Sequence, residues 1–99
     1  MKRSVRVLRR ARRDLQEIYD FLAREAPGSA DRVVDALFDV IESLETMSER
    51  GGRPRDPTLR ASGYRFLVEG NHVVFYKIAG RHVRVYRVLH GARRYRVLL

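Results

Sequence analysis

Three strand-like runs separated by two glycine-led turns, between residues 64 and 90, constrain the fold of this chain more than any other feature. Residues 64–69, 72–79 and 82–90 are dense in Val, Ile, Tyr and Phe, which suit a pleated, half-buried surface. Gly70 and Gly80 supply the positive φ that short hairpin turns require. The sequence therefore predicts a three-stranded antiparallel meander.

The last of these strands is predicted to have two mixed faces. Strict alternation places on one face Val83, Val85, Arg87 and Leu89. The opposite face then holds Arg84, Tyr86, Val88 and His90. Because neither face is purely apolar, we expect both to be partly covered by other elements or to be functional.

The first half of the chain predicts a short strand followed by two helices. Residues 4–8 alternate like a strand, which we expect to join the same sheet. Apolar residues recur at helical spacing from about residue 10 to residue 25, where the Ala26-Pro27-Gly28 break ends the helix. Ser29 is predicted to cap a second helix over residues 30–48. The short break predicts an antiparallel helical hairpin that packs on the sheet.

Three aromatic residues on these helices, Tyr19, Phe21 and Phe38, are interpreted most simply as core or core-edge residues. The alternative is that some of them line an exposed groove that a segment of a partner fills. Residues 49–62 contain two Gly, two Pro and four Arg without hydrophobic periodicity, so they are predicted to form a loop. This loop either contacts phosphate or an acidic protein face, or is simply solvated.

The size and composition predict one domain over residues 1–99, with a single modest core. The absence of cysteine excludes a disulfide framework and a thiolate metal site. His72, His82 and His90 lie on different strands and turns without a carboxylate at ligand spacing, so we expect no metal and no other cofactor. No segment is long and apolar enough to span a membrane, so we expect a soluble, cytoplasmic protein.

The net charge of +9 is divided unevenly along the chain. Residues 1–13 carry seven Lys or Arg and no acid, and residues 50–99 carry twelve basic residues against two acidic ones. Residues 14–49, by contrast, carry ten acidic residues against two basic ones. Codon bias can explain the preference for Arg over Lys, but it does not explain this segregation. We therefore expect a positive lobe that attracts polyanions or an acidic partner.

Several motifs occur in an order that is typical of one protein family. They are Leu59-Arg60, Gly63-Tyr64-Arg65, VVFYKI and RVLHGAR, the last over residues 87–93. Together they resemble the RelE/ParE superfamily, the toxin halves of type II toxin–antitoxin pairs. The RVLHGAR ending is more similar to the ParE branch. This resemblance implies an α+β fold, with an N-terminal strand, an antiparallel two-helix hairpin and a three-stranded meander in one mostly antiparallel sheet.

The resemblance leaves the target, and whether the protein is an enzyme, open. A ParE-like toxin of a plasmid-stabilisation module would inhibit DNA gyrase by binding, without a catalytic group. A RelE-like toxin would be a ribosome-dependent endoribonuclease that cuts mRNA. The second alternative is a non-toxic, basic nucleic-acid-binding module. We favour the ParE-like reading and assign no catalytic residue under it.

The motif residues nevertheless suggest sites under each reading. In a ribonuclease, Arg65 and Arg93 match arginines that hold phosphate, with His90 as a possible base and Tyr95 as a possible acid. Arg65 could instead pair with Glu69 on its own strand. The residues expected to contact the target or nucleic acid are Arg60, Arg65, Arg87, Arg93 and Arg94.

The resemblance also implies partners. A cognate, ParD-like antitoxin would wrap the toxin with a helix and an extended tail, giving a hetero-oligomer. The positive lobe predicts that this tail is acidic. The target would be DNA gyrase, or the ribosome and mRNA under the alternative, and no membrane contact is expected.

Overall fold

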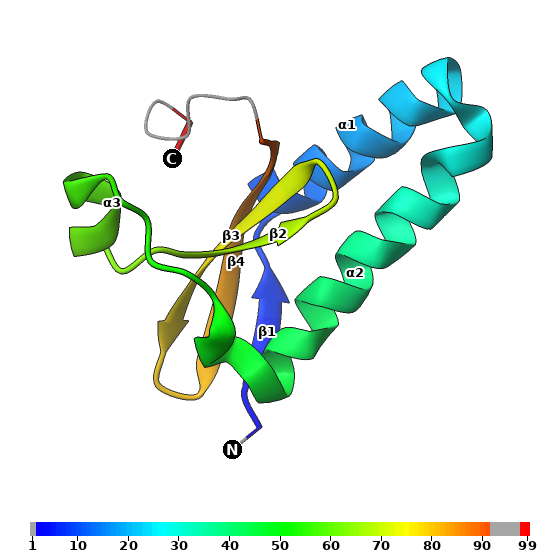
Figure 1. The fold of residues 1–99 in the computed structure, drawn as a ribbon. Helices are drawn as coiled ribbons and strands as arrows, with labels where there is room; N and C mark the ends of the chain where they lie inside the picture. The colour runs from blue at the N-terminus through cyan, green and yellow to red at the C-terminus, as the bar shows by residue number, and fades with distance from the viewer. Residues whose placement is uncertain (1, 92–97) are drawn as a thin grey trace.

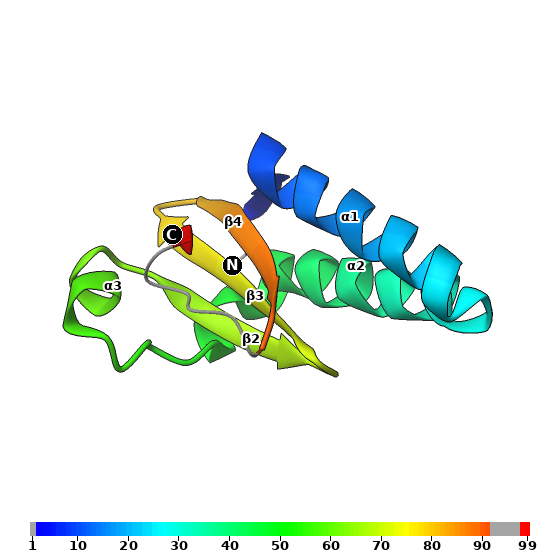
Figure 2. The same ribbon diagram turned by 90° about the horizontal axis from the view of Figure 1, so that it is seen from above.

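The chain folds into two layers, a four-stranded sheet with a helical hairpin on one face (Figures 1 and 2). The computed structural model describes residues 2–91 and 98–99. Its elements are β1 (Ser4–Val7), α1 (Arg9–Glu25), η1 (Pro27–Ser29), α2 (Ala30–Met47), η2 (Ser48–Arg50), α3 (Pro57–Ala61), β2 (Arg65–Glu69), β3 (His72–Ala79) and β4 (His82–His90). The predicted α+β fold is therefore confirmed.

The sheet has the strand order β1-β4-β3-β2. β2, β3 and β4 form the predicted antiparallel meander, and Gly70 and Gly80 take φ values of 58° and 61° in its two turns. β1 joins the same sheet, as expected, and pairs in parallel with β4. Because β1 pairs with the last strand, it forms one edge of the sheet and places β4 in the interior.

The main core lies between the sheet and the hairpin. Its largest buried side chains come from β3, β4 and α2, and they are Tyr76, Leu37, Leu44, Val74, Val83, Val85 and Val88. The Tyr76 hydroxyl donates to the carbonyl of Ser48 at 2.6 Å and accepts from the amide of Gly51 at 3.1 Å. This buried hydroxyl therefore fixes the chain where it leaves α2.

A second, smaller core covers the opposite face of the sheet. It comprises Leu59, Tyr64, Val73, Phe75 and Leu89, with Phe66, Tyr86, Leu98 and Leu99 packed against it. Leu59 comes from α3, which lies within the segment that we predicted to be a loop. That prediction is wrong because the Asp56 side chain caps this short helix, accepting from the amides of Thr58 at 2.9 Å and Leu59 at 3.1 Å. Pro57 at the first helical position also favours the helix.

Two further predictions need correction. Ser29 precedes α2, but its hydroxyl donates to the carbonyl of Ala26 and does not cap the helix.

Strict alternation along β4 is also wrong, because a β-bulge interrupts its pairing with β3. Tyr76 lies opposite Val85 while Phe75 lies opposite Arg87, so one residue of β4 has no partner. Past the bulge the two faces exchange, which is how Val88 joins Val83 and Val85 in the main core.

A buried ion pair joins α1 to β4 just beyond this bulge. The Arg87 guanidinium donates to both carboxylate oxygens of Asp14, at 2.7 and 3.0 Å, and to the carbonyl of Leu98 at 2.7 Å. The same carboxylate accepts from the amide of Val88 at 3.0 Å. Only 4% of Asp14 and 7% of Arg87 is exposed. The bond with Asp14 raises the pKa of Arg87, so the guanidinium stays charged under all ordinary conditions.

Among the described residues, no helix combines the length and apolar character that crossing a membrane requires.

We predict that Asp14→Asn destabilises the protein by about 3–5 kcal/mol, because it leaves the buried Arg87 cation without a counter-charge. Urea unfolding monitored by circular dichroism measures this change. Glu17→Gln is the matched control, since Glu17 is exposed and pairs with Arg10 at 3.6 Å on the surface. The control should lose less than about 1 kcal/mol. Equal losses in the two variants would show that the buried ion pair contributes no more to the free energy of unfolding than an exposed pair does.

Candidate functional site

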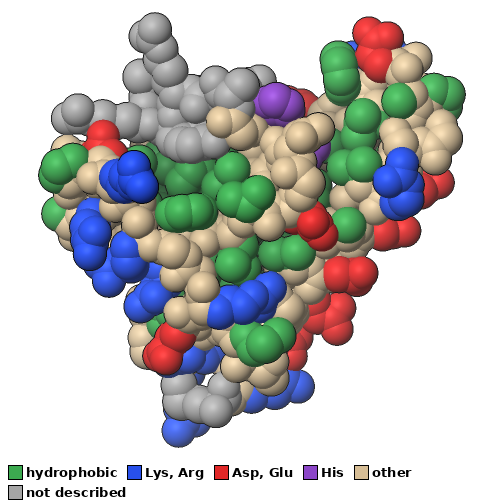
Figure 3. Space-filling view, in the orientation of Figure 1, with side chains coloured by type: hydrophobic (Ala, Val, Ile, Leu, Met, Phe, Trp, Pro, Cys, Tyr) green, Lys and Arg blue, Asp and Glu red, His purple; other side chains and the backbone are tan. Residues whose placement is uncertain are grey.

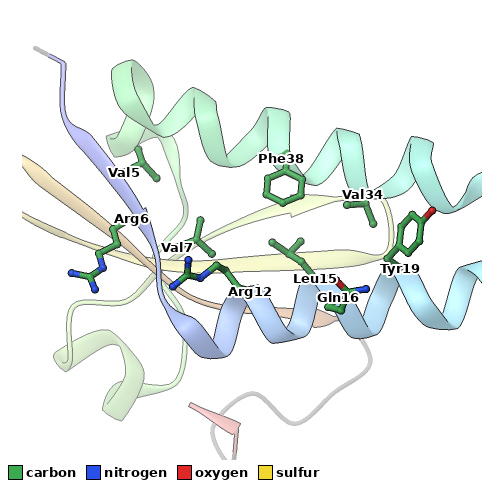
Figure 4. A pocket seen from close by; sticks show the side chains of 9 residues that line it. All are labelled: Val5, Arg6, Val7, Arg12, Leu15, Gln16, Tyr19, Val34 and Phe38. Atoms are coloured by element: carbon green, nitrogen blue, oxygen red, sulfur yellow. The ribbon is translucent and has the colours of Figure 1, made fainter.

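A groove runs between β1 and the two long helices (Figure 4). It encloses about 850 Å³ and is lined by Val5, Arg6, Val7, Arg12, Leu15, Gln16, Tyr19, Val34 and Phe38. The centre of the groove is apolar, because Phe38 and Val34 of α2 face Leu15 of α1. Arginines supply the polar side chains at the end beside β1. The groove is therefore an apolar channel with one cationic end.

The aromatic residues of the hairpin are exposed, so the interpretation of all three as core or core-edge residues is wrong. The exposed fractions are 37% for Tyr19, 53% for Phe21 and 48% for Phe38. The reason is geometric: the ends of α1 and α2 that carry the hairpin turn project beyond the sheet (Figures 1 and 2). Helical periodicity predicts an apolar face but does not show whether another layer covers it. The alternative interpretation, an exposed groove, fits the structure for Tyr19 and Phe38.

Tyr19 also connects the two helices at the rim of the groove. Its hydroxyl interacts with the carboxylate of Asp31 on α2, and this negative charge raises the pKa of Tyr19. The phenol therefore stays protonated and remains a hydrogen-bond donor at neutral pH.

A second hollow of about 650 Å³ lies between α1 and the end of the sheet that carries the β2–β3 turn. The rings of His72 and His90 meet there edge to face, with centroids 5.8 Å apart. Burial, and to a lesser extent the neighbouring His90, lowers the pKa of His72. Within residues 2–91 and 98–99, no three His, Asp or Glu side chains lie close enough together to hold a metal ion. Because histidine, acidic and apolar side chains all line the hollow, its surface is partly polar and partly apolar.

The structure separates the site residues that the sequence suggested. Arg60 is exposed on α3, whereas Arg87 is committed to the buried ion pair with Asp14. Arg65 donates to the carbonyl of Glu49 at 3.3 Å rather than to Glu69 on its own strand. Three further predicted residues lie outside the described part of the chain: Arg93, Arg94 and Tyr95.

Arg65 and His90 are not brought together. Arg65 pairs with Tyr76 at the start of β2, whereas His90 pairs with His72 at the far end of the sheet. Tyr76 lies four positions along β3 from His72, which corresponds to about 13 Å. These two side chains therefore belong to opposite ends of the sheet.

A cluster of Lys77, Tyr64 and Tyr86 lies on the outer face of the sheet, which is the face opposite the helical hairpin. The sequence did not predict this cluster. The Lys77 ammonium lies over the ring of Tyr64, 4.4 Å from its centroid, and over that of Tyr86 at 4.9 Å. The two rings meet edge to face at 5.3 Å. The alternation of β3 places Lys77 on this face, but the contact with Tyr64 requires the pairing register, which the sequence analysis did not derive.

Charge is segregated in space as well as along the chain. In Figure 3, Lys and Arg gather on the side of the molecule that carries α3, whereas Asp and Glu follow the outer edge of α2. The helical layer is thus acidic along one edge, and the sheet layer carries the basic surface.

Comparisons with known proteins identify the family. The family described as the ParE toxin of type II toxin–antitoxin systems matches residues 5–95. Toxin ParE1 of Caulobacter vibrioides is 36% identical over 86 residues, which cover 86% of this chain and 85% of that toxin. Toxin RelE3 of the same bacterium is 32% identical over 92 residues, covering 93% and 98% of the two chains.

Solved structures show the same fold. The chromosomal ParDE TA system from P. aeruginosa matches with a TM-score of 0.74 at 23% identity, over 90% of this chain and 96% of that chain. The toxin-antitoxin complex RelBE2 from Mycobacterium tuberculosis matches with a TM-score of 0.69 at 25% identity, over 91% and 99%. Because the family match spans nearly the whole chain, the protein described here belongs to the ParE toxin family of type II toxin–antitoxin systems, within the RelE/ParE superfamily.

Proposed function

We propose that this toxin inhibits DNA gyrase by binding it, as a ParE-like toxin of a plasmid-stabilisation module, and that a cognate antitoxin neutralises it. The separation of Arg65 from His90 carries this proposal. RNA cleavage requires a base at the ribose 2′-hydroxyl and a cation at the adjacent phosphate, within a few ångströms of each other. Arg65 and His90 occupy positions about 13 Å apart along the sheet, which argues against their acting on the same phosphate.

The environment of Lys77 supports the same conclusion. It is the only lysine in the strands, and its ammonium lies between two tyrosine rings rather than near a histidine. Its contacts are those of a side chain that stabilises the outer face of the sheet. The match to the ParE toxin family and the identity to Toxin ParE1 favour the gyrase target over the ribosome.

We place the antitoxin in the groove between β1, α1 and α2. The two solved structures named above are toxin–antitoxin systems. The channel is long and apolar, and Tyr19 and Phe38 are exposed along it, which suits the apolar face of an amphipathic helix. Arg6 and Arg12 at one end suit an acidic segment that follows the helix. The proposed partner is thus a helix with an acidic tail, in a hetero-oligomer with the toxin.

The gyrase proposal predicts that purified toxin, free of antitoxin, abolishes supercoiling by gyrase at saturation. Plasmid relaxation by a type I topoisomerase is the control and should continue unchanged, because the toxin is proposed to bind gyrase itself. Normal supercoiling at saturating toxin would remove the proposal.

Bacterial cells in which the toxin is expressed distinguish the alternatives. New, codon-phased mRNA 5′ ends that disappear in Arg65→Ala would support the ribonuclease alternative. The 32% identity to Toxin RelE3 is the reason to test this alternative. Unchanged growth would support a non-toxic, basic nucleic-acid-binding module.

The antitoxin proposal predicts that Phe38→Ala weakens antitoxin binding by about thirtyfold, which corresponds to about 2 kcal/mol for an aromatic anchor at an interface. Phe21→Ala is the matched control, because Phe21 is equally exposed but lines the other hollow. It should change the affinity by less than about threefold. Calorimetric titration with the cognate antitoxin measures both variants. Equal effects of the two substitutions would place the antitoxin elsewhere.

A further inference from the structure

Three cations form a row across the outer face of the sheet. The register pairs Arg6 of β1 with Arg84 of β4, and Arg84 in turn with Lys77 of β3. Residues paired in this way point to the same face, and neighbouring strands lie about 4.8 Å apart. Like charges directly opposite each other destabilise a strand pair. A row of three like charges therefore costs stability wherever nothing neutralises it.

No carboxylate of the described residues neutralises this row. Carboxylates pair with Lys2, Arg3, Arg10 and Arg87, and none of these ion pairs includes a member of the row. The other strand positions on this face are also free of acid, and they are Ser4, Phe66, Val68, Val73, Phe75, Ala79, His82, Tyr86, Arg87 and Leu89. Arg6 and Arg84 are exposed to solvent. The strand positions of this face thus carry positive charge and no negative charge.

The aromatic rings beside the row are already occupied. Tyr64 is buried, and its ring is covered by Lys77 and contacted by the edge of Tyr86. Lys77 also lies over the ring of Tyr86. Proteins that bind single-stranded nucleic acid stack bases on open aromatic rings. On this face the cations are exposed but no aromatic ring beside the row is open for stacking. The face therefore fits a phosphate backbone better than unpaired bases.

Two of the three members of the row, Arg84 and Lys77, also lie outside the groove proposed for the antitoxin. Protein interfaces take most of their binding energy from a few anchors, chiefly aromatic side chains and arginines, that fill well-packed pockets. The groove and the second hollow both lie beside α1, and neither is lined by Arg84 or Lys77. Sequence-independent binding to DNA, by contrast, arises almost entirely from cations at the phosphates.

We propose that the row Arg6–Arg84–Lys77 binds the phosphate backbone of duplex DNA. The inference concerns the toxin and DNA alone, so it does not depend on the proposed gyrase target. Binding should be independent of sequence and weak, because only three phosphates are contacted. It should also fall steeply with salt, by about 0.9 units of log K per unit of log salt for each phosphate contact.

The test is fluorescence anisotropy of a short labelled duplex with antitoxin-free toxin, between about 50 and about 200 mM salt. The double variant Arg6→Gln/Arg84→Gln should reduce the salt slope by about 1.8, since two contacts are lost. Arg24→Gln/Arg32→Gln is the matched control, because it removes two exposed positive charges from the acidic helices. The control should keep the slope of the wild-type toxin.

Arg84→Lys keeps the charge of the row and should also keep the wild-type slope. Urea unfolding checks the fold, and Arg6→Gln/Arg84→Gln should be at least as stable as the wild type, because it removes a pair of like charges. The same slope in the row variant and in the control would overturn the proposal. So would a row variant that loses binding to polyglutamate but not to DNA, since that result would assign the row to an acidic protein segment.

Discussion

The buried pair of Asp14 and Arg87 is the contact on which the arrangement of the two layers depends. β1 stops pairing with β4 at Val85, where the amide of Leu8 donates to the Val85 carbonyl at 3.0 Å. Beyond that point, the carboxylate of Asp14 takes the place of the missing strand by accepting from the amide of Val88. The pair thus holds α1 against the edge of the sheet. The groove beside α1 is therefore positioned by this contact.

The β-bulge explains why the ion pair can form. Without the extra residue, Arg87 would follow Val83 and Val85 into the main core, where a cation would be buried among aliphatic side chains. The bulge moves Arg87 to the other face and brings Val88 into the core in its place. From there the long guanidinium side chain reaches Asp14 around the free edge of β4. The irregularity in the strand is therefore what allows a buried charge to find its partner.

The elements that the sequence predicted are those with local signals. Strands of β-branched and aromatic residues, two glycine turns and helical periodicity all depend on neighbours within a few residues. Three other features depend on contacts between residues that are far apart in the sequence. The exposure of Phe38 is set by where the sheet ends, the position of Arg87 by a bulge, and the row containing Arg84 by the parallel pairing of strands almost 80 residues apart. The candidate site was predicted poorly because its parts meet only through that register.

The groove and the row share one residue, and this links them electrostatically. Arg6 lines the groove through β1 and also stands opposite Arg84 in the row (Figure 4). An acidic group that reached the cationic end of the groove would neutralise Arg6 and so lower the positive potential next to Arg84, well within the Debye length of about 8 Å at physiological salt. A partner in the groove would then weaken the attraction of the row for a polyanion without covering it. The two surfaces, one apolar and one cationic, are therefore not independent, because a single short strand carries the edge of both.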